Sequence, residues 1–239
     1  MKRNHLIALT LLLGVTAIAL SSCKKDPEAV AELISKAEAG EIVEILVSEK
    51  TAGMTAPTID MTEILQTVLN SCGQPGDTSY QITKELGPAT YSRSFNMSWL
   101  VNCSPLSIPT NAAFDVNGAG SFNYQTWNGT TTATGNITFT GLALTAQEYI
   151  GNGSYQYSGA LTGSTRRSNP TFDCDVTLNL ADLTISKSTS AITGGNGTVI
   201  VKASTTGGEN ITLNGTLVFN GNGTATVTFN GNSHTFQLS

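Results

Sequence analysis

The sequence predicts an all-β fold: an antiparallel meander forming a sandwich or an up-and-down barrel, with one or two short helices at its N-terminal side. Three observations predict it. From residue 79 onward apolar residues recur at every second position, Asn-Gly and Gly-Gly pairs of the hairpin type separate the segments, and no helical pattern lies between them. Because one face of each segment is apolar and the other polar, an antiparallel sheet is favoured over a parallel α/β architecture.

The chain opens with a leader. Lys2 and Arg3 precede an uncharged, mostly apolar run at residues 6–20, which has the form of a signal peptide and is too short to cross a bilayer comfortably. The run ends in Leu20-Ser21-Ser22-Cys23, which resembles the lipobox of bacterial lipoproteins. That resemblance implies removal of residues 1–22 and acylation of Cys23 on its sulfur and its amine. Several acyl chains together hold a protein stably at a membrane.

The residues that follow support the same family. Cys23-Lys24-Lys25-Asp26 is similar to the start of outer-membrane lipoproteins from the Bacteroidota, and segments 182–185 and 221–227 resemble sequences of such lipoproteins. The resemblance implies a lipid-anchored place at the bacterial outer membrane, on either its periplasmic or its surface side. It implies no activity.

Two helices are expected before the strands. Residues 23–56 are interpreted as a lipid-anchored tether that includes a helix over 29–39, ended by Gly40. A second helix is predicted over 60–70, where Asp60 is the N-cap and an apolar stripe covers the core. Residues 57–239 are then expected to form a single β-rich domain.

The strands follow in order. The clearest is 91–103, whose odd positions are apolar except for Arg93 and whose even positions are mostly polar. Others are predicted at 112–127, 130–144, 149–163, 171–187, 191–204, 208–219, 223–230 and 233–238. Phase slips near Ala181 and Gly141 predict β-bulges.

Three cysteines remain besides the lipidated one. An oxidising cell envelope favours one disulfide among Cys72, Cys103 and Cys174. Cys174 alternates with Phe172 and Val176 on the apolar face of its strand, so it is expected to be a small buried hydrophobe. The predicted pair is therefore Cys72 with Cys103.

Charge and histidine content exclude several functions. The formal net charge falls from -5 to -7 when Lys2 and Arg3 are removed, which argues against nucleic acid as a partner. His5 is lost with the leader, so His234 alone cannot build a histidine metal cluster, and no nucleophile motif accompanies it. We expect His234 to be an exposed turn residue, and we expect no cofactor and no metal.

Candidate binding residues are few. Tyr124, Trp127, Tyr155 and Tyr157 can stack on sugars, or they can pack against one another across strands. Arg93, alone on an apolar face, is expected to form a buried ion pair, with contact to an acidic ligand in a cavity as the alternative.

Two functions remain. The first is a noncatalytic binding or structural module of the cell envelope, held at the membrane by its lipid anchor, with a glycan, an apolar ligand or a protein as partner. The second is a hydrolase acting on polysaccharide with Asp173 and Asp175, or Asp182, as its acids. Residues two apart on a strand lie about 7 Å from one another, a spacing suited to such a pair.

Overall fold

The computed structural model describes residues 34–239 except 88, 164–170 and 206–209. The predicted signal peptide, the lipobox-like segment with Cys23 and the residues directly after it lie outside the described residues, as does the predicted Gly207-Gly208 turn. Leu33–Ser239 forms one compact unit. Because this unit contains its own core, sheet and disulfide, we treat it as a part that folds alone.

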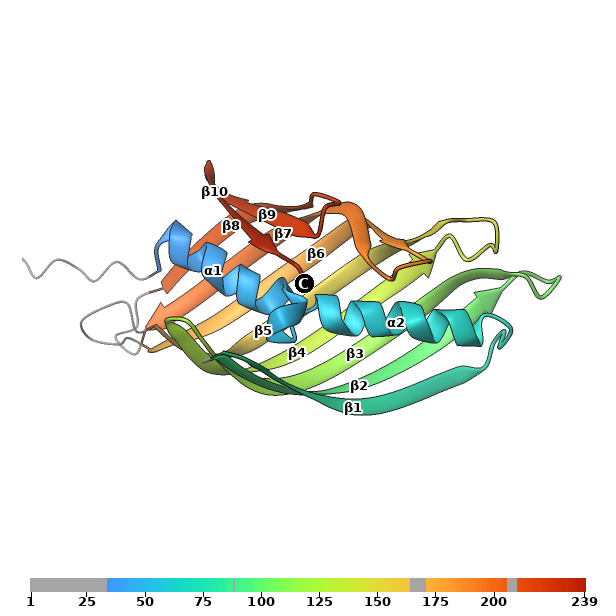
Figure 1. Cartoon of the computed structure of the whole chain (residues 1–239), viewed down its shortest axis with the longest axis horizontal. Helices are drawn as coiled ribbons and strands as arrows, with labels where there is room; N and C mark the ends of the chain where they lie inside the picture. Colours follow the sequence, from blue (N-terminus) through green and yellow to red (C-terminus); the bar gives the residue numbers. More distant parts are fainter. Residues whose placement is uncertain (1–33, 88, 164–170, 206–209) are drawn as a thin grey trace, which may run out of the picture. The chain divides into compact units, whose positions relative to one another are not determined.

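Ten strands form one antiparallel sheet in meander order, so the predicted all-β meander is confirmed (Figure 1). The strands are β1 Pro75–Leu86, β2 Ala89–Cys103, β3 Pro109–Tyr124, β4 Trp127–Thr140, β5 Glu148–Gly163, β6 Thr171–Ser186, β7 Ile192–Thr205, β8 Asn210–Phe219, β9 Thr224–Phe229 and β10 Asn232–Gln237. The sheet is not closed into a barrel, because among the described strands β1 pairs only with β2 and β10 only with β9. No second sheet among them makes a sandwich.

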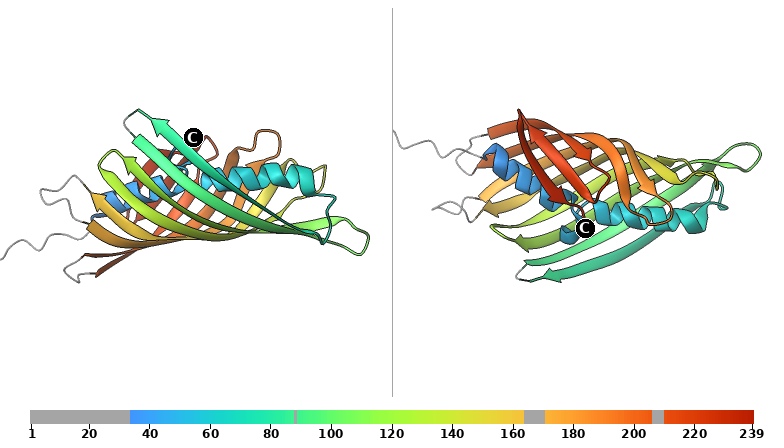
Figure 2. Two further views of the ribbon diagram at one scale, coloured as in Figure 1. Left: turned by 90° about the horizontal axis from the view of Figure 1, so that it is seen from below. Right: turned by 45° about the horizontal axis from the view of Figure 1, so that its top comes forward.

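Helices take the place that a second sheet would have. The sheet is curved, and α1 (Lys36–Val47), the short η1 (Glu49–Thr51) and α2 (Thr55–Val68) lie on its concave side (Figures 1 and 2). The inward residues of the strands form one hydrophobic core with the apolar residues of α1 and with Met61 and Leu65 of α2. The polar positions of the strands face solvent on the convex side, which accounts for the alternation in the sequence.

The helix boundaries differ from the predicted ones. A capping box between Ser35 and Glu38 starts α1, and Gly40, the predicted stop, lies inside it. A side chain at Gly40 would place its Cβ 2.8 Å from the Cβ of His234, so this glycine permits the close approach of α1 to β10. Residues 34–56 of the expected tether therefore belong to the folded unit. Helix α2 begins at Thr55, so Asp60 lies inside that helix and does not cap it.

Local irregularities occur where the sequence loses its phase. The β6–β7 pairing shifts between Ala181 and Thr184, and Asp182 has a left-handed φ of 51°, which confirms the predicted bulge. Gly141 instead follows the end of β4, with φ +74°. Asn230 and Gly231 both have positive φ and make the predicted two-residue turn between β9 and β10.

The cysteines pair as predicted. Cys72 and Cys103 form a disulfide, which ties the segment after α2 to the end of β2. Cys174 is a buried free thiol on the inner face of β6.

Candidate functional site

Arg93 is buried on the inner face of β2, between Tyr91 and Phe95. Its exposed fraction is 2%, and Nε and both Nη atoms have no hydrogen-bond partner. Among the described residues no carboxylate forms an ion pair with it, so the predicted buried pair is wrong. The group that faces the guanidinium is the ring of Tyr157, whose centroid lies 5.7 Å from Cζ. Burial lowers the pKa of Arg93 because it removes water from the charge, and the neighbouring Tyr157 acts in the opposite direction.

The neighbouring strands leave room for the arginine. Gly120 is its register partner on β3, and a Cβ at Gly120 would collide with Cγ of Arg93. The arginine stem therefore lies against bare backbone. Burial raises the pKa of Tyr157 to about 12, and the adjacent charge of Arg93 acts in the opposite direction.

Three further residues of this interior carry buried polar atoms without a hydrogen-bond partner. They are the hydroxyls of Tyr91 on β2, Tyr80 on β1 and Thr55 on α2. Burial raises the pKa of both tyrosines. The carboxyl of Asp60 on α2 lies near Tyr80 without a hydrogen bond of good geometry, and burial raises its pKa as well. Since buried polar groups in folded proteins are rarely unpaired, four such residues in one interior require an explanation.

The aromatic candidates lie in the same interior. Trp127, Tyr155 and Tyr157 are at most 2% exposed, and Tyr124 is half-buried. Tyr155 and Tyr157 pack with centroids 6.3 Å apart. That pair lies within β5, whereas Tyr124 packs on Tyr91 of β2 at 5.9 Å and Trp127 on Phe172 of β6 at 6.4 Å, so cross-strand packing, the alternative considered for these rings, is found for Tyr124 and Trp127. They present no exposed row on which a sugar could stack.

Polar contacts hold α1 to the sheet. Trp127 Nε1 donates to Glu41 at 2.7 Å, and the hydroxyl of Tyr124 donates to Glu44 at 3.3 Å. Glu44 also lies 2.8 Å from Nε2 of His234. His234 is therefore a half-buried residue of β10 and not the exposed turn residue that was predicted, because the strand begins at Asn232, directly after the turn.

Helix α2 turns a threonine-rich face to the sheet. Thr55, Thr58 and Thr62 are buried beside the apolar Met61 and Leu65, whereas α1 buries mainly Ile, Val and Leu side chains. Thr58 donates to the carbonyl of its own helix at Met54, and its hydroxyl also lies 3.0 Å from that of Tyr155. Because it buries less apolar area, we expect α2 to detach from the sheet at a lower free energy than α1.

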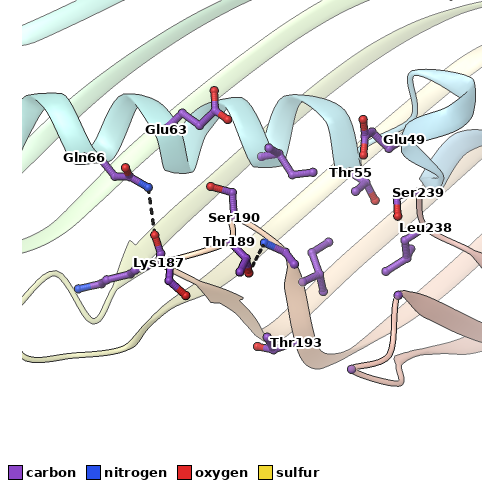
Figure 3. A pocket seen from close by; sticks show the side chains of 16 residues that line it. Glu49, Thr55, Glu63, Gln66, Lys187, Thr189, Ser190, Thr193, Leu238 and Ser239 are labelled. Carbon is purple, nitrogen blue, oxygen red and sulfur yellow. Dashed lines mark hydrogen bonds between the residues drawn. The ribbon is translucent and has the colours of Figure 1, made fainter.

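A groove of about 780 Å³ runs beside α2. It lies between this helix and the turn that joins β6 to β7, and Gln66 Nε2 spans it to the carbonyl of Lys187 at 3.3 Å (Figure 3). Ile59, Ile192 and Leu238 supply apolar lining. Thr55, whose hydroxyl is buried and unpaired, also lines the groove, which therefore reaches the interior at this residue.

The carboxylates proposed for hydrolysis lie on the convex side. Asp173 and Asp175 are exposed, and with Lys202 they line a depression of about 390 Å³. Asp175 accepts a hydrogen bond of 2.6 Å from Ser158 Oγ. Both acids extend from one face of one strand, so they do not oppose each other across a cleft as a glycosidase pair does. Asp182 is exposed and lies outside this depression.

Within the described ranges, no group of three or more His, Cys, Asp or Glu residues is arranged to hold a metal ion. No helix of that part of the chain has the length and apolarity to span a membrane. The comparisons with known proteins give no family: no family model, curated protein or solved structure matches this chain.

Proposed function

We propose that the chain is a lipid-anchored protein of the bacterial outer membrane that binds an apolar ligand, without catalysis, between the concave face of its sheet and its helices. The observation that carries the proposal is the buried set Thr55, Tyr80, Tyr91 and Arg93, which have polar atoms without partners in one interior. Leaving a buried donor or acceptor unpaired costs about 1–3 kcal/mol, and more for a charged group. An apolar chain alone cannot pair with these atoms, so the ligand needs a polar group at one end of its apolar chain, and a site completed by that group explains why several unpaired atoms occur together.

Access to this interior depends on α2. A ligand must take up space that the helices fill in this structure, and α2 is the helix with the smaller apolar contact. The groove beside it offers an apolar wall at Ile59, Ile192 and Leu238 where a chain can first make contact. Displacing the threonine face of α2 from the inner side of the sheet then exposes the aromatic rings to the ligand.

The lipid anchor has its own experiment. Mass spectrometry of the membrane-extracted protein should find an acylated N-terminal Cys23, and Cys23→Ala should move the protein to the soluble fraction. Retention of Cys23→Ala in the membrane fraction contradicts the anchor.

Ligand binding is tested with the unit 33–239. The neutral probe N-phenyl-1-naphthylamine should gain fluorescence saturably, and oleyl alcohol should displace it. The matched control is Leu144→Ser, which removes a side chain that is 93% exposed and should leave the titration unchanged. Probe binding that is absent, or that disappears in Leu144→Ser, contradicts an interior site.

Hydrolysis of polysaccharide is the second candidate, and the depression at Asp173 and Asp175 is the observation in its favour. Release of reducing sugar from bacterial polysaccharides, lost in Asp175→Asn, would support it and overturn the noncatalytic proposal. The parallel placement of the two acids leads us to expect no release.

A further inference from the structure

We infer that Arg93 binds the negatively charged head of an amphipathic ligand, a carboxylate or phosphate monoester carried on an apolar chain. The inference rests on the proposed function and names the ligand class for the same interior. Arg93 is 2% exposed and has no counter-ion among the described residues, and its one polar neighbour of note, the hydroxyl of Tyr157, makes no hydrogen bond of good geometry with it.

A buried cation needs an anion. Taking a charge out of water is expensive, and only a paired, hydrogen-bonded partner restores much of the lost solvation. The planar fork of an arginine matches the two oxygens of a carboxylate or a phosphate, which can accept two parallel hydrogen bonds. The unpaired Nε and Nη atoms of Arg93 supply this fork.

The acids nearest to the interior are already engaged. Glu41 accepts the hydrogen bond of Trp127, and Glu44 contacts His234 and Tyr124. Glu49 forms an ion pair of 2.9 Å with Lys84. Asp60 lies near Tyr80, and none of these four makes an ion pair with Arg93. The missing negative charge must therefore come from outside the described residues.

The surroundings of Arg93 suit a charged head followed by an apolar chain. Tyr91, two residues before it on the same face, has an unpaired hydroxyl that can donate to an anion. In the other direction the same face carries Phe95, Met97, Trp99 and Val101, an apolar row roughly 20 Å long. A head at Arg93 places its chain along this row.

The experiment measures displacement of N-phenyl-1-naphthylamine from the unit 33–239 by matched lipids. Oleate should bind at least tenfold more tightly than oleyl alcohol, which differs in the head alone. Arg93→Met should abolish this preference while oleyl alcohol still binds, and Arg93→Lys should retain part of it. Lys202→Met, which removes an exposed cation from the convex side, should leave the preference unchanged. Dodecyl phosphate compared with oleate then identifies the preferred head.

The outcomes separate the two proposals. Equal binding of oleate and oleyl alcohol to the wild-type unit, or a preference that survives in Arg93→Met, overturns the role of Arg93 and leaves the apolar site standing. Displacement by neither lipid overturns the proposed function itself. A cooperative thermal melt of Arg93→Met establishes that the variant is folded, and the retained binding of oleyl alcohol provides a second check.

Discussion

Replacing Arg93 by methionine should stabilise the ligand-free protein. In a core built for stability, removal of a long buried side chain weakens folding. Here the side chain is 2% exposed, its three guanidinium nitrogens have no hydrogen bond of good geometry, and the ring of Tyr157 replaces only part of the water that folding removes. Methionine retains an unbranched apolar stem that can lie against Gly120 and removes the charge.

The expected change in the free energy of unfolding is the difference between two opposing contributions. Replacing buried ionic groups by apolar ones of similar volume is often stabilising by about 1–4 kcal/mol. Against this stands the loss of the contact between Arg93 and the ring of Tyr157, 5.7 Å from its centroid, which contributes about 0.5–2 kcal/mol. The net expectation is a gain of about 1–2 kcal/mol, or roughly 2–8 °C in Tm for a domain of this size.

Equilibrium urea unfolding of the unit 33–239, with the disulfide intact and bound lipid removed, measures this gain. The control Lys202→Met should change the free energy of unfolding by less than about 0.5 kcal/mol, as surface substitutions do. A loss of more than about 1 kcal/mol in Arg93→Met would refute the reasoning, because Arg93 would then be satisfied by the protein and have no need of a ligand.

Three further predictions concern the cysteines and α2. Replacing Cys72 and Cys103 by serine should lower the free energy of unfolding by about 3–4 kcal/mol in urea, since their separation is 31 residues, and an unchanged midpoint would contradict this. Burial raises the pKa of Cys174 to about 12, so iodoacetamide at pH 8 should label it only after unfolding, and rapid labelling of the native protein by mass spectrometry would contradict its burial. Burial raises the pKa of Asp60 above its ordinary value of 3.8, so its contribution to stability is complete below that value and is lost as pH rises through the folded pKa. Asp60→Asn should therefore stabilise the protein at pH 7, with a difference from wild type that shrinks toward pH 4 in urea unfolding, and an unchanged difference would contradict it.

The sheet was predictable because its determinants are local. Alternation along β2, the turn at Asn230-Gly231 and the phase slip at Ala181 all act within a few residues, and the structure contains each of them. The choice between sandwich, barrel and open sheet is not local, because it depends on what covers the concave face. The propensity of Gly40 to end a helix was outweighed by a tertiary contact with His234, 194 positions later in the chain.

The candidate site was predictable only in part. Arg93 stood out because it interrupts an apolar face, but alternation cannot show whether a buried charge has a partner on another element. The four aromatic residues were singled out as candidates for ligand binding, but alternation could not show that three of them are buried, which depends on α1 and α2 lying over them. Thr55 gave no signal, since its unpaired hydroxyl is a consequence of where α2 packs.

Fluorescence quenching by a brominated lipid tests the central claim most directly. Trp99 lies on the inner face of β2 within the apolar row that follows Arg93, and Leu100 is its neighbour on the outer face. In Trp127→Phe, which leaves Trp99 as the one tryptophan, 9,10-dibromostearate should quench the emission saturably. In a variant that combines Trp99→Phe, Trp127→Phe and Leu100→Trp, the one tryptophan lies on the outer face, and 9,10-dibromostearate should not quench its emission. Quenching of the outer tryptophan with the inner one unaffected would contradict binding between the sheet and the helices.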